Sequence, residues 1–346
     1  MFNTKNISKY VLALGVIIIV STYSKQLKGS FENNDEDYDM IKNYLLNESP
    51  LYGYNRPKLW IHSKYELNAR KWKDFHSRNS TDLNQSYLHL TIKTIINHCG
   101  EDFNICLIDD DSFSKLLPNW DIELSTVAEP MKGYYRGLGM AQLIYIYGGM
   151  TIPNSFVCTK NLKPLYDSYI SDNKPFVCEM INRTTDLSKS NPALQYIPTI
   201  DIMGAPKNDP VMLEIIESLK ILFQTGHISN EINFKGVINN KFINLINNEK
   251  MNKIGGEVIG VKNNQGKQIL IDDLCEESFL NLHTNAVGIY IPSDEVLTRV
   301  KYAWLANINT EELLNSNIII AKYIKASLTD TTNEYYNKTE RCVVSI

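Results

Sequence analysis

The chain has 346 residues, 43% of them hydrophobic, and a formal net charge of −4 at pH 7. A chain of this length can bury one large hydrophobic core or two small ones. Its slight acidic excess argues against a protein that binds nucleic acid, because binding to phosphates needs a surplus of Lys and Arg.

A near-continuous apolar run occupies residues 10–23, with lysines on both sides. A membrane-spanning helix needs roughly 20 residues, or about 17 at the low end, and residues 8–24 reach that lower figure. The sequence therefore predicts an uncleaved signal anchor over 1–24, with a cleaved signal peptide and a buried helix as alternatives. The expected localisation is a single-pass membrane protein, in the secretory pathway or in a virion. Lysines at both ends leave the orientation open.

Composition divides the rest of the chain into three parts. Residues 25–55 are polar and rich in acidic side chains, which is typical of a stalk or linker. Apolar segments begin after Pro57 and predict a globular domain over 56–328. The polar residues 329–346 are expected to form a C-terminal tail.

Three elements predict the beginning of an α/β domain. Residues 58–62 form a short apolar run after a proline, which is typical of a strand. Residues 86–99 carry apolar side chains at helical spacing, and 103–108 are again a short apolar run. This strand, helix and strand succession is typical of the first half of a doubly wound sheet.

Three consecutive acids, Asp109, Asp110 and Asp111, follow the second of these strands. One interpretation is a metal site, because carboxylate oxygens are the preferred ligands of hard cations. The other is a helix start, because acids favour the N-cap and the first turn.

The stretch 131–158 is the most distinctive part of the sequence. It begins with a helical pattern that is apolar nearly all round, which predicts a buried helix. Arg136 is the only charged residue between 134 and 158, and a buried charge needs a partner or a ligand. Gly148 and Gly149 then predict the end of the helix, and a strand is expected at 150–152.

The second half of the chain predicts further strands and helices. Residues 174–178 and 199–205 are typical of strands, with Asp201 as the one acid inside the second. Asp209 followed by Pro210 predicts a helix start, because aspartate is a good N-cap and proline suits the first turn. The other expectations are a loop at 160–169, helices at 211–223, 234–248, 310–314 and 317–327, and a hairpin of strands 255–261 and 268–271.

The six cysteines contain no Cys-x-x-Cys pair, so their spacing predicts no zinc site. Two interpretations remain for them. They are either scattered buried thiols or the halves of disulfides in a secretory compartment.

The stretch 131–158 resembles the core of glycosyltransferases of the capsular-polysaccharide-synthesis type and of glycosyltransferase family 32. These families carry a Ser-Asp-x-x-Arg helix, then Leu-Tyr-x-Tyr-Gly-Gly, then a strand that holds Asp-x-Asp or Asp-Ala-Thr. Arg136, Tyr145, Tyr147, Gly148 and Gly149 match this pattern. The resemblance spans about 56–223 and implies a GT-A-like (Rossmann-like) α/β domain behind the N-terminal anchor.

The resemblance also implies a function and a set of site residues. The function is transfer of a sugar from a nucleoside diphosphate sugar to a hydroxyl of a glycan or glycoprotein. Arg136 is expected to stabilise negative charge on the leaving diphosphate. Asp201 is either a catalytic or acceptor-binding carboxylate or a hydrogen-bonded structural residue. The residues expected to contact the sugar nucleotide are Trp60, His62, Gly148, Gly149, Asn154 and Ser155. For Trp60 and His62 the alternative is a core tryptophan and a strand-end histidine in solvent.

The sequence departs from the family pattern at the acids. Gly133 stands where the family has the helix aspartate, and Pro153 and Ser155 stand where it has the strand aspartates that hold a divalent metal. Proline and serine supply no anionic oxygen, so Mn²⁺ or Mg²⁺ is not expected at the usual motif. His283 is either a displaced metal ligand, as in some GT-A enzymes, or a solvated loop residue. The alternative function is a catalytically inactive protein with a glycan-binding or structural role, in a virion or at a membrane.

Overall fold

The computed structural model of the chain describes residues 56–63, 85, 87–128, 131–179, 196–224 and 231–329. The predicted anchor over 1–24, the stalk over 25–55 and nearly all of the predicted tail lie outside the described residues. Within the described ranges, no helix combines the length and the apolar character that a membrane crossing requires.

A mixed six-stranded sheet forms the centre of the domain, in the order β2-β1-β3-β6-β5-β7. β1 is parallel to both of its neighbours, β2 and β3, and β5 is parallel to β7. β6 alone runs against its two neighbours, β3 and β5. The bounds are β1 (Lys58–His62), β2 (Asn104–Ile108), β3 (Gly149–Thr151), β5 (Phe176–Glu179), β6 (Pro198–Ala205) and β7 (Asn252–Ile254).

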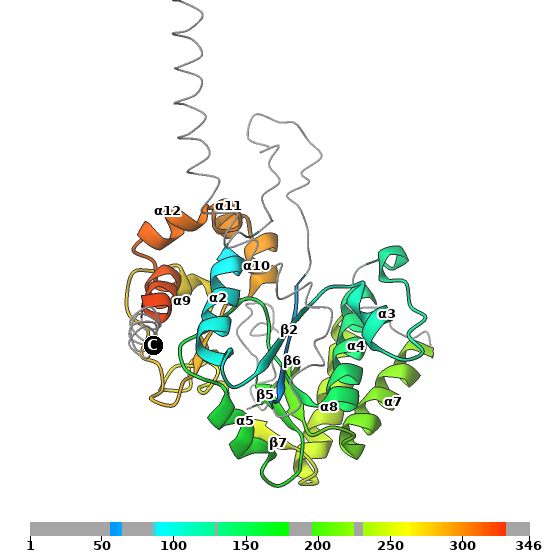
Figure 1. Cartoon of the computed structure of the whole chain (residues 1–346). Helices are drawn as coiled ribbons and strands as arrows, with labels where there is room; N and C mark the ends of the chain where they lie inside the picture. The colour runs from blue at the N-terminus through cyan, green and yellow to red at the C-terminus, as the bar shows by residue number, and fades with distance from the viewer. Residues whose placement is uncertain are drawn as a thin grey trace, which may run out of the picture. The chain divides into compact units, whose positions relative to one another are not determined.

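Helices cover both faces of this sheet, so the predicted α/β class is confirmed. Figure 1 shows α4, α7 and α8 on one side of the strands and α2 on the other. Alternate residues of β1 serve the two layers, as the pleat of a strand requires. The main helices are α2 (Tyr87–Cys99), α4 (Met131–Tyr147), α7 (Pro210–Gln224) and α8 (Glu231–Asn247).

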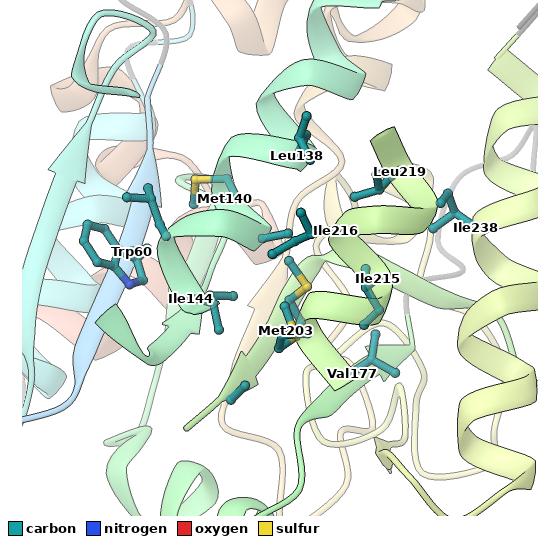
Figure 2. Packing of buried hydrophobic residues seen from close by; sticks show 14 of the residues in the cluster. Trp60, Leu138, Met140, Ile144, Val177, Met203, Ile215, Ile216, Leu219 and Ile238 are labelled. Carbon is teal, nitrogen blue, oxygen red and sulfur yellow. The ribbon is translucent and has the colours of Figure 1, made fainter. Parts of the chain in front are cut away.

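Two hydrophobic clusters hold these layers together. The larger one joins α4, α7 and α8 to the sheet and includes Trp60, Ile144, Met203 and Ile216 (Figure 2). The smaller one joins α2 to β4 (Phe156–Cys158), β8 (Gly288–Tyr290) and the C-terminal helices. The remaining helical elements are α3 (Ser112–Leu116), η2 (Leu124–Thr126), α5 (Lys163–Ile170), α9 (Ile271–Leu274), α10 (Ser293–Thr298), η3 (Val300–Tyr302), α11 (Ala303–Asn307), α12 (Thr310–Asn315) and a helix at 319–329.

Several local expectations are confirmed and two are wrong. The helix after Asp209 is confirmed, since the Asp209 carboxylate accepts a hydrogen bond of 2.9 Å from the N–H of Met212. Residues 160–169 are not a loop, because α5 begins there with a proline in its first turn. The hairpin is wrong too: residues 255–261 form turns, and a lone bridge between Lys262 and Gln268 is the strand pairing found there.

The small sheet of β4 and β8 was missed for a physical reason. Its strands pair antiparallel across more than a hundred residues, with Phe156 opposite Tyr290. A partner so distant leaves no trace in the local pattern, because strands are defined by their pairing as much as by their own residues.

Gly148 and Gly149 let the chain reverse from α4 into β3 within two residues. Both have positive φ angles, +72° and +98°, a region that side chains other than glycine rarely occupy. A Cβ atom on Gly149 would lie 2.1 Å from the carbonyl oxygen of Lys58 in the neighbouring strand. The Trp60 indole N–H also donates a 3.0 Å hydrogen bond to the carbonyl of Gly148. The positive φ angles and the close approach to Lys58 therefore explain why glycine occupies these positions.

Replacing Gly149 by alanine should lower the free energy of unfolding by about 2 to 5 kcal/mol, because backbone strain adds to an overlap with β1. Gly266→Ala is the matched control. Gly266 also has a positive φ, +77°, but no atom lies within 4 Å of its Cβ position. Only the strain of about 1 to 2 kcal/mol should appear there. Urea denaturation measures both, and equal losses would contradict the role assigned to the close approach.

Candidate functional site

The candidate site lies at the edge of the sheet where the parallel strands β1, β2 and β3 end. Ligands of open α/β sheets bind outside the carboxyl ends of the strands. His62 is the last residue of β1, and Asp110 follows the end of β2 by two residues. The turn at 153–155 follows β3. Because β6 is antiparallel to β3, its first residues lie at this same edge.

An ion pair between Arg136 and Asp110 is the centre of the site. Arg136 donates from Nε to Oδ1 at 2.7 Å and from a terminal nitrogen to Oδ2 at 2.6 Å. Nε2 of His62 lies 2.9 Å from the same Oδ1. An ionised carboxylate can only accept hydrogen bonds, so this nitrogen of His62 carries the proton. The two-pronged contact fixes the plane of the guanidinium as well as its position.

Close packing brings Arg136 to this carboxylate. The His62 ring stacks on Phe113 at 5.6 Å between centroids. A Cβ atom at Gly139 would lie 2.6 Å from the Phe113 ring, so only glycine allows α4 to approach α3 this closely. Gly137 lies against Ile200 of β6. A Cβ atom there would be 3.3 Å from the Ile200 side chain, a tighter contact than usual but a smaller overlap than at Gly139. Small residues on α4 thus seat the helix that carries Arg136.

The electrostatics favour an ionised Asp110. Burial opposes ionisation of this carboxyl, but hydrogen bonds and charge from Arg136 and His62 outweigh burial and hold the pKa of Asp110 well below its usual range. Arg136 is 8% exposed, so its charge is largely removed from water. Each of the two charges therefore needs the other, and the pair stays ionised at neutral pH.

The acids on either side of Asp110 are placed differently. Asp109 accepts hydrogen bonds from the backbone N–H of Ser112 at 2.9 Å and from its hydroxyl at 2.6 Å. It stabilises the first turn of α3, in line with the helix-start interpretation. Asp111 is exposed beside it.

The turn after β3 is held by polar contacts to α2 and β1. Thr91 of α2 donates to the carbonyl oxygen of Asn154 at 2.5 Å, and the Asn154 amide lies 3.4 Å from the Ser63 hydroxyl. Ser155 is 1% exposed, and its hydroxyl has no hydrogen-bond partner among the described residues. Asn154 therefore borders the site, whereas the Ser155 oxygen is enclosed by protein.

Asp201 lies on β6 near the same edge. It is exposed, and its carboxylate is 3.1 Å from the hydroxyl of Thr199 on the same strand. Asp201 is thus separate from the ion pair, and its role stays a prediction.

The structure does not bring all predicted ligand contacts to this edge. Trp60 is fully buried in the larger hydrophobic cluster. Gly148 and Gly149 lie opposite Lys58, at the start of β1, and so belong to the other edge of the sheet. His283 lies in a turn in the C-terminal half of the chain. Its Nδ1 accepts a hydrogen bond of 3.1 Å from the N–H of Asn285.

Asp110 is the functional residue whose role sequence reasoning missed. Its position after an apolar strand marked it as a polar strand end, but not as the partner of Arg136. The signal that existed was Arg136 itself, since a charge on a buried helix requires an opposite charge. Asp109, Asp110 and Asp111 are adjacent in the sequence, and only the packing of α4 shows that Asp110 is the one that pairs with Arg136.

The residues at this edge do not fit a divalent metal. A metal-binding carboxylate needs accessible oxygens, but Asp110 is engaged by Arg136 and His62, and Asp109 by Ser112. Pro153 has no side-chain ligand atom, and its carbonyl oxygen accepts a hydrogen bond from the N–H of Phe156. The Ser155 hydroxyl is neutral and enclosed. Across the described residues, no three His, Cys, Asp or Glu side chains come together as a metal site would require.

Comparison with known proteins gives structural similarities at low identity. No known family profile matches the chain, and no curated protein matches it by sequence. The glycosyltransferase GlyE of Streptococcus pneumoniae TIGR4 is 10% identical over 82% of this chain and 64% of its own, with a TM-score of 0.39. The chain thus spans under two thirds of that protein's length.

Two further solved structures with a similar arrangement are glycosyltransferases. The PaToxG glycosyltransferase is 12% identical over 63% of this chain and 81% of its own, with a TM-score of 0.33. The galactosyltransferase LgtC, solved with donor and acceptor sugar analogues, is 10% identical over 58% of this chain and 74% of its own, with a TM-score of 0.30.

Removing one partner of the ion pair should be costly. Arg136→Ala leaves the part-buried Asp110 carboxylate without its main partner, and we expect a loss of about 2 to 4 kcal/mol in the free energy of unfolding. Lys163→Ala, which breaks an exposed pair with Asp167 on α5, should cost less than about 1 kcal/mol. The double variant Asp110→Asn/Arg136→Gln removes both charges and should recover part of the loss. Chemical denaturation measures all three, and a double variant that is no more stable than Arg136→Ala would contradict the pairing.

The ion pair also predicts a pH dependence. A pKa of Asp110 that is lower in the folded than in the unfolded chain stabilises the fold above about pH 4, and this stability is lost as the pH falls further. The difference in unfolding free energy between the wild type and Asp110→Asn should therefore stay constant above about pH 5 and shrink progressively as the pH falls below about pH 4. Denaturation curves at half-unit intervals test this, and a difference that stays constant at low pH as well would show that Asp110 is not ionised in the fold.

Proposed function

We propose that the chain is a glycosyltransferase-type protein that binds a nucleoside diphosphate sugar at the carboxyl edge of β1, β2 and β3. The observation that carries this proposal is the guanidinium of Arg136, fixed at that edge by Asp110 and His62. The same arginine is one of the five residues that carry the sequence resemblance. A buried, oriented cation beside the strand ends of an open α/β sheet is suited to an anionic ligand.

The proposed reaction places charge where this cation lies. The bond between the anomeric carbon and the diphosphate breaks, and a new bond forms to a hydroxyl of a glycan or glycoprotein acceptor. The proton of that hydroxyl passes to a base, for which Asp201 is the proposed residue. Negative charge grows on the leaving diphosphate, and Arg136 stabilises it without reorganising, since its orientation is already set.

Asn154 is the proposed contact for sugar or ribose hydroxyls. Its side chain is partly exposed at the strand end, next to Ser63. Its backbone is held by Thr91, so the amide is presented from a fixed turn. Trp60, Gly148 and Gly149 act on this site through the fold and not by touching the ligand.

A second candidate function is a non-catalytic, glycan-binding or structural protein derived from such a transferase. The observation that favours this second function is that Pro153 and Ser155 stand where the resembled families have acids, although the strands and helices around them are formed. Membrane attachment through residues 1–24 remains a prediction for either function.

Calorimetry of the full chain with UDP- and GDP-sugars tests the proposal. We expect binding to the wild type and at least a tenfold loss in the Asp110→Asn/Arg136→Gln variant, which removes the charge without leaving a buried carboxylate unpaired. Lys163→Ala is the control and should bind as the wild type does. Donor hydrolysis or transfer that Asp201→Asn abolishes would identify an enzyme. Binding without turnover would favour the second function, and no binding would refute the site.

A further inference from the structure

We propose that this site holds its sugar nucleotide without a divalent cation, which the resembled families place between the protein and the diphosphate. The proposal rests on the proposed function and concerns the way in which the ligand's charge is offset. Its basis is the donor chemistry of the residues at the strand ends and the partners that each of them already has.

The turn after β3 lacks the ligand atoms that a cation requires. Pro153 has no side-chain donor, and its ring restricts the backbone at that position. Ser155 has a neutral oxygen, with no solvent contact and no hydrogen-bond partner among the described residues. Hard divalent cations select anionic oxygens that an ion can reach, so neither residue replaces an aspartate.

Of the acids that follow β2, Asp109 and Asp110 are already engaged. Asp111 and Asp201 are exposed, and among the described residues no group of three His, Cys, Asp or Glu side chains that could hold a metal ion includes either of them. Both oxygens of Asp110 accept hydrogen bonds from Arg136, and one also contacts His62. Moving Asp110 to a metal would leave the guanidinium of Arg136, which is 8% exposed, without this partner. Removing one member of a buried ion pair is strongly unfavourable. Asp109 is held by the backbone and hydroxyl of Ser112, and its release would cost α3 that contact.

Asp272, the acid further along the chain that could supply a displaced metal site, is neutralised by cations of its own cluster. Asp272 accepts hydrogen bonds from Arg299 at 2.7 Å and from Lys301 at 3.0 Å. Two cations hold this one carboxylate, and hydrogen bonding to Arg299 outweighs its desolvation and lowers the pKa of Asp272. An arrangement of this kind repels a metal ion instead of attracting it.

The positive charge at the site therefore comes from a side chain. Arg136 is permanently charged, and its planar donor array suits phosphate oxygens. Its position does not depend on an ion from solution, because Asp110 and His62 orient it. A ligand bound in this way should be insensitive to chelators.

Manganese titration followed by electron paramagnetic resonance tests the ion alone. The full chain at about 0.1 mM should leave the spectrum of free Mn²⁺ unchanged, and so should Asp110→Asn. Saturable loss of the free signal with a dissociation constant below about 0.1 mM would overturn the proposal. Asp110→Asn, Asp109→Asn and Asp272→Asn would then show which carboxylate binds the ion.

Calorimetry with UDP-glucose and GDP-mannose tests the complex, once in EDTA and once in millimolar MnCl₂. We expect dissociation constants that agree within about threefold between the two conditions, and a loss of at least tenfold in Asp110→Asn/Arg136→Gln in both. Binding that is more than thirtyfold tighter with manganese would refute metal independence while leaving the proposed function intact. Absence of binding in both conditions would refute the proposed function, and the manganese titration would still decide the question of the ion.

Discussion

The ion pair between Arg136 and Asp110 is the interaction on which the architecture of the site depends. It joins the end of β2, the outer strand of the sheet, to the helix α4, across 26 residues of sequence. Neither charge is stable there alone, because both are partly or largely removed from water. The pair therefore ties the orientation of α4 to the ends of β1 and β2, and any change at one member is transmitted to the other.

The glycines of α4 make this pairing possible. Gly139 and Gly137 bring the helix against Phe113 and Ile200, and Gly148 and Gly149 return the chain into β3 at the opposite edge of the sheet. Each is placed where a Cβ atom would meet a neighbour, so the helix is seated by contact and not by polar attraction. The site thus rests on packing at both ends of one helix, and its charge network is oriented by that packing.

The site combines a cation at the strand ends with a lack of acids in the turn after β3. Its fixed cation lies where an anionic ligand of an open α/β sheet would bind, yet proline and an enclosed serine follow the central strand. An arginine already held by a carboxylate is preorganised, and preorganised charge stabilises a developing anion without further rearrangement. The arrangement accounts for both the proposed ligand class and the proposed independence from metal ions.

The sequence by itself determined the α/β class, most long elements and the buried helix with its single arginine, because hydrophobic periodicity and end signals act over a few residues. Local pattern also placed His62, Asn154 and Asp201 at strand ends or on strands. Only the tertiary structure decided that Asp110, and not Asp109 or Asp111, partners Arg136, and that Trp60 and the Gly148–Gly149 pair serve the fold. Partner choice, the pairing of β4 with β8 and the enclosure of Ser155 depend on contacts between distant segments, whose energies are set by packing and leave no local periodicity to read.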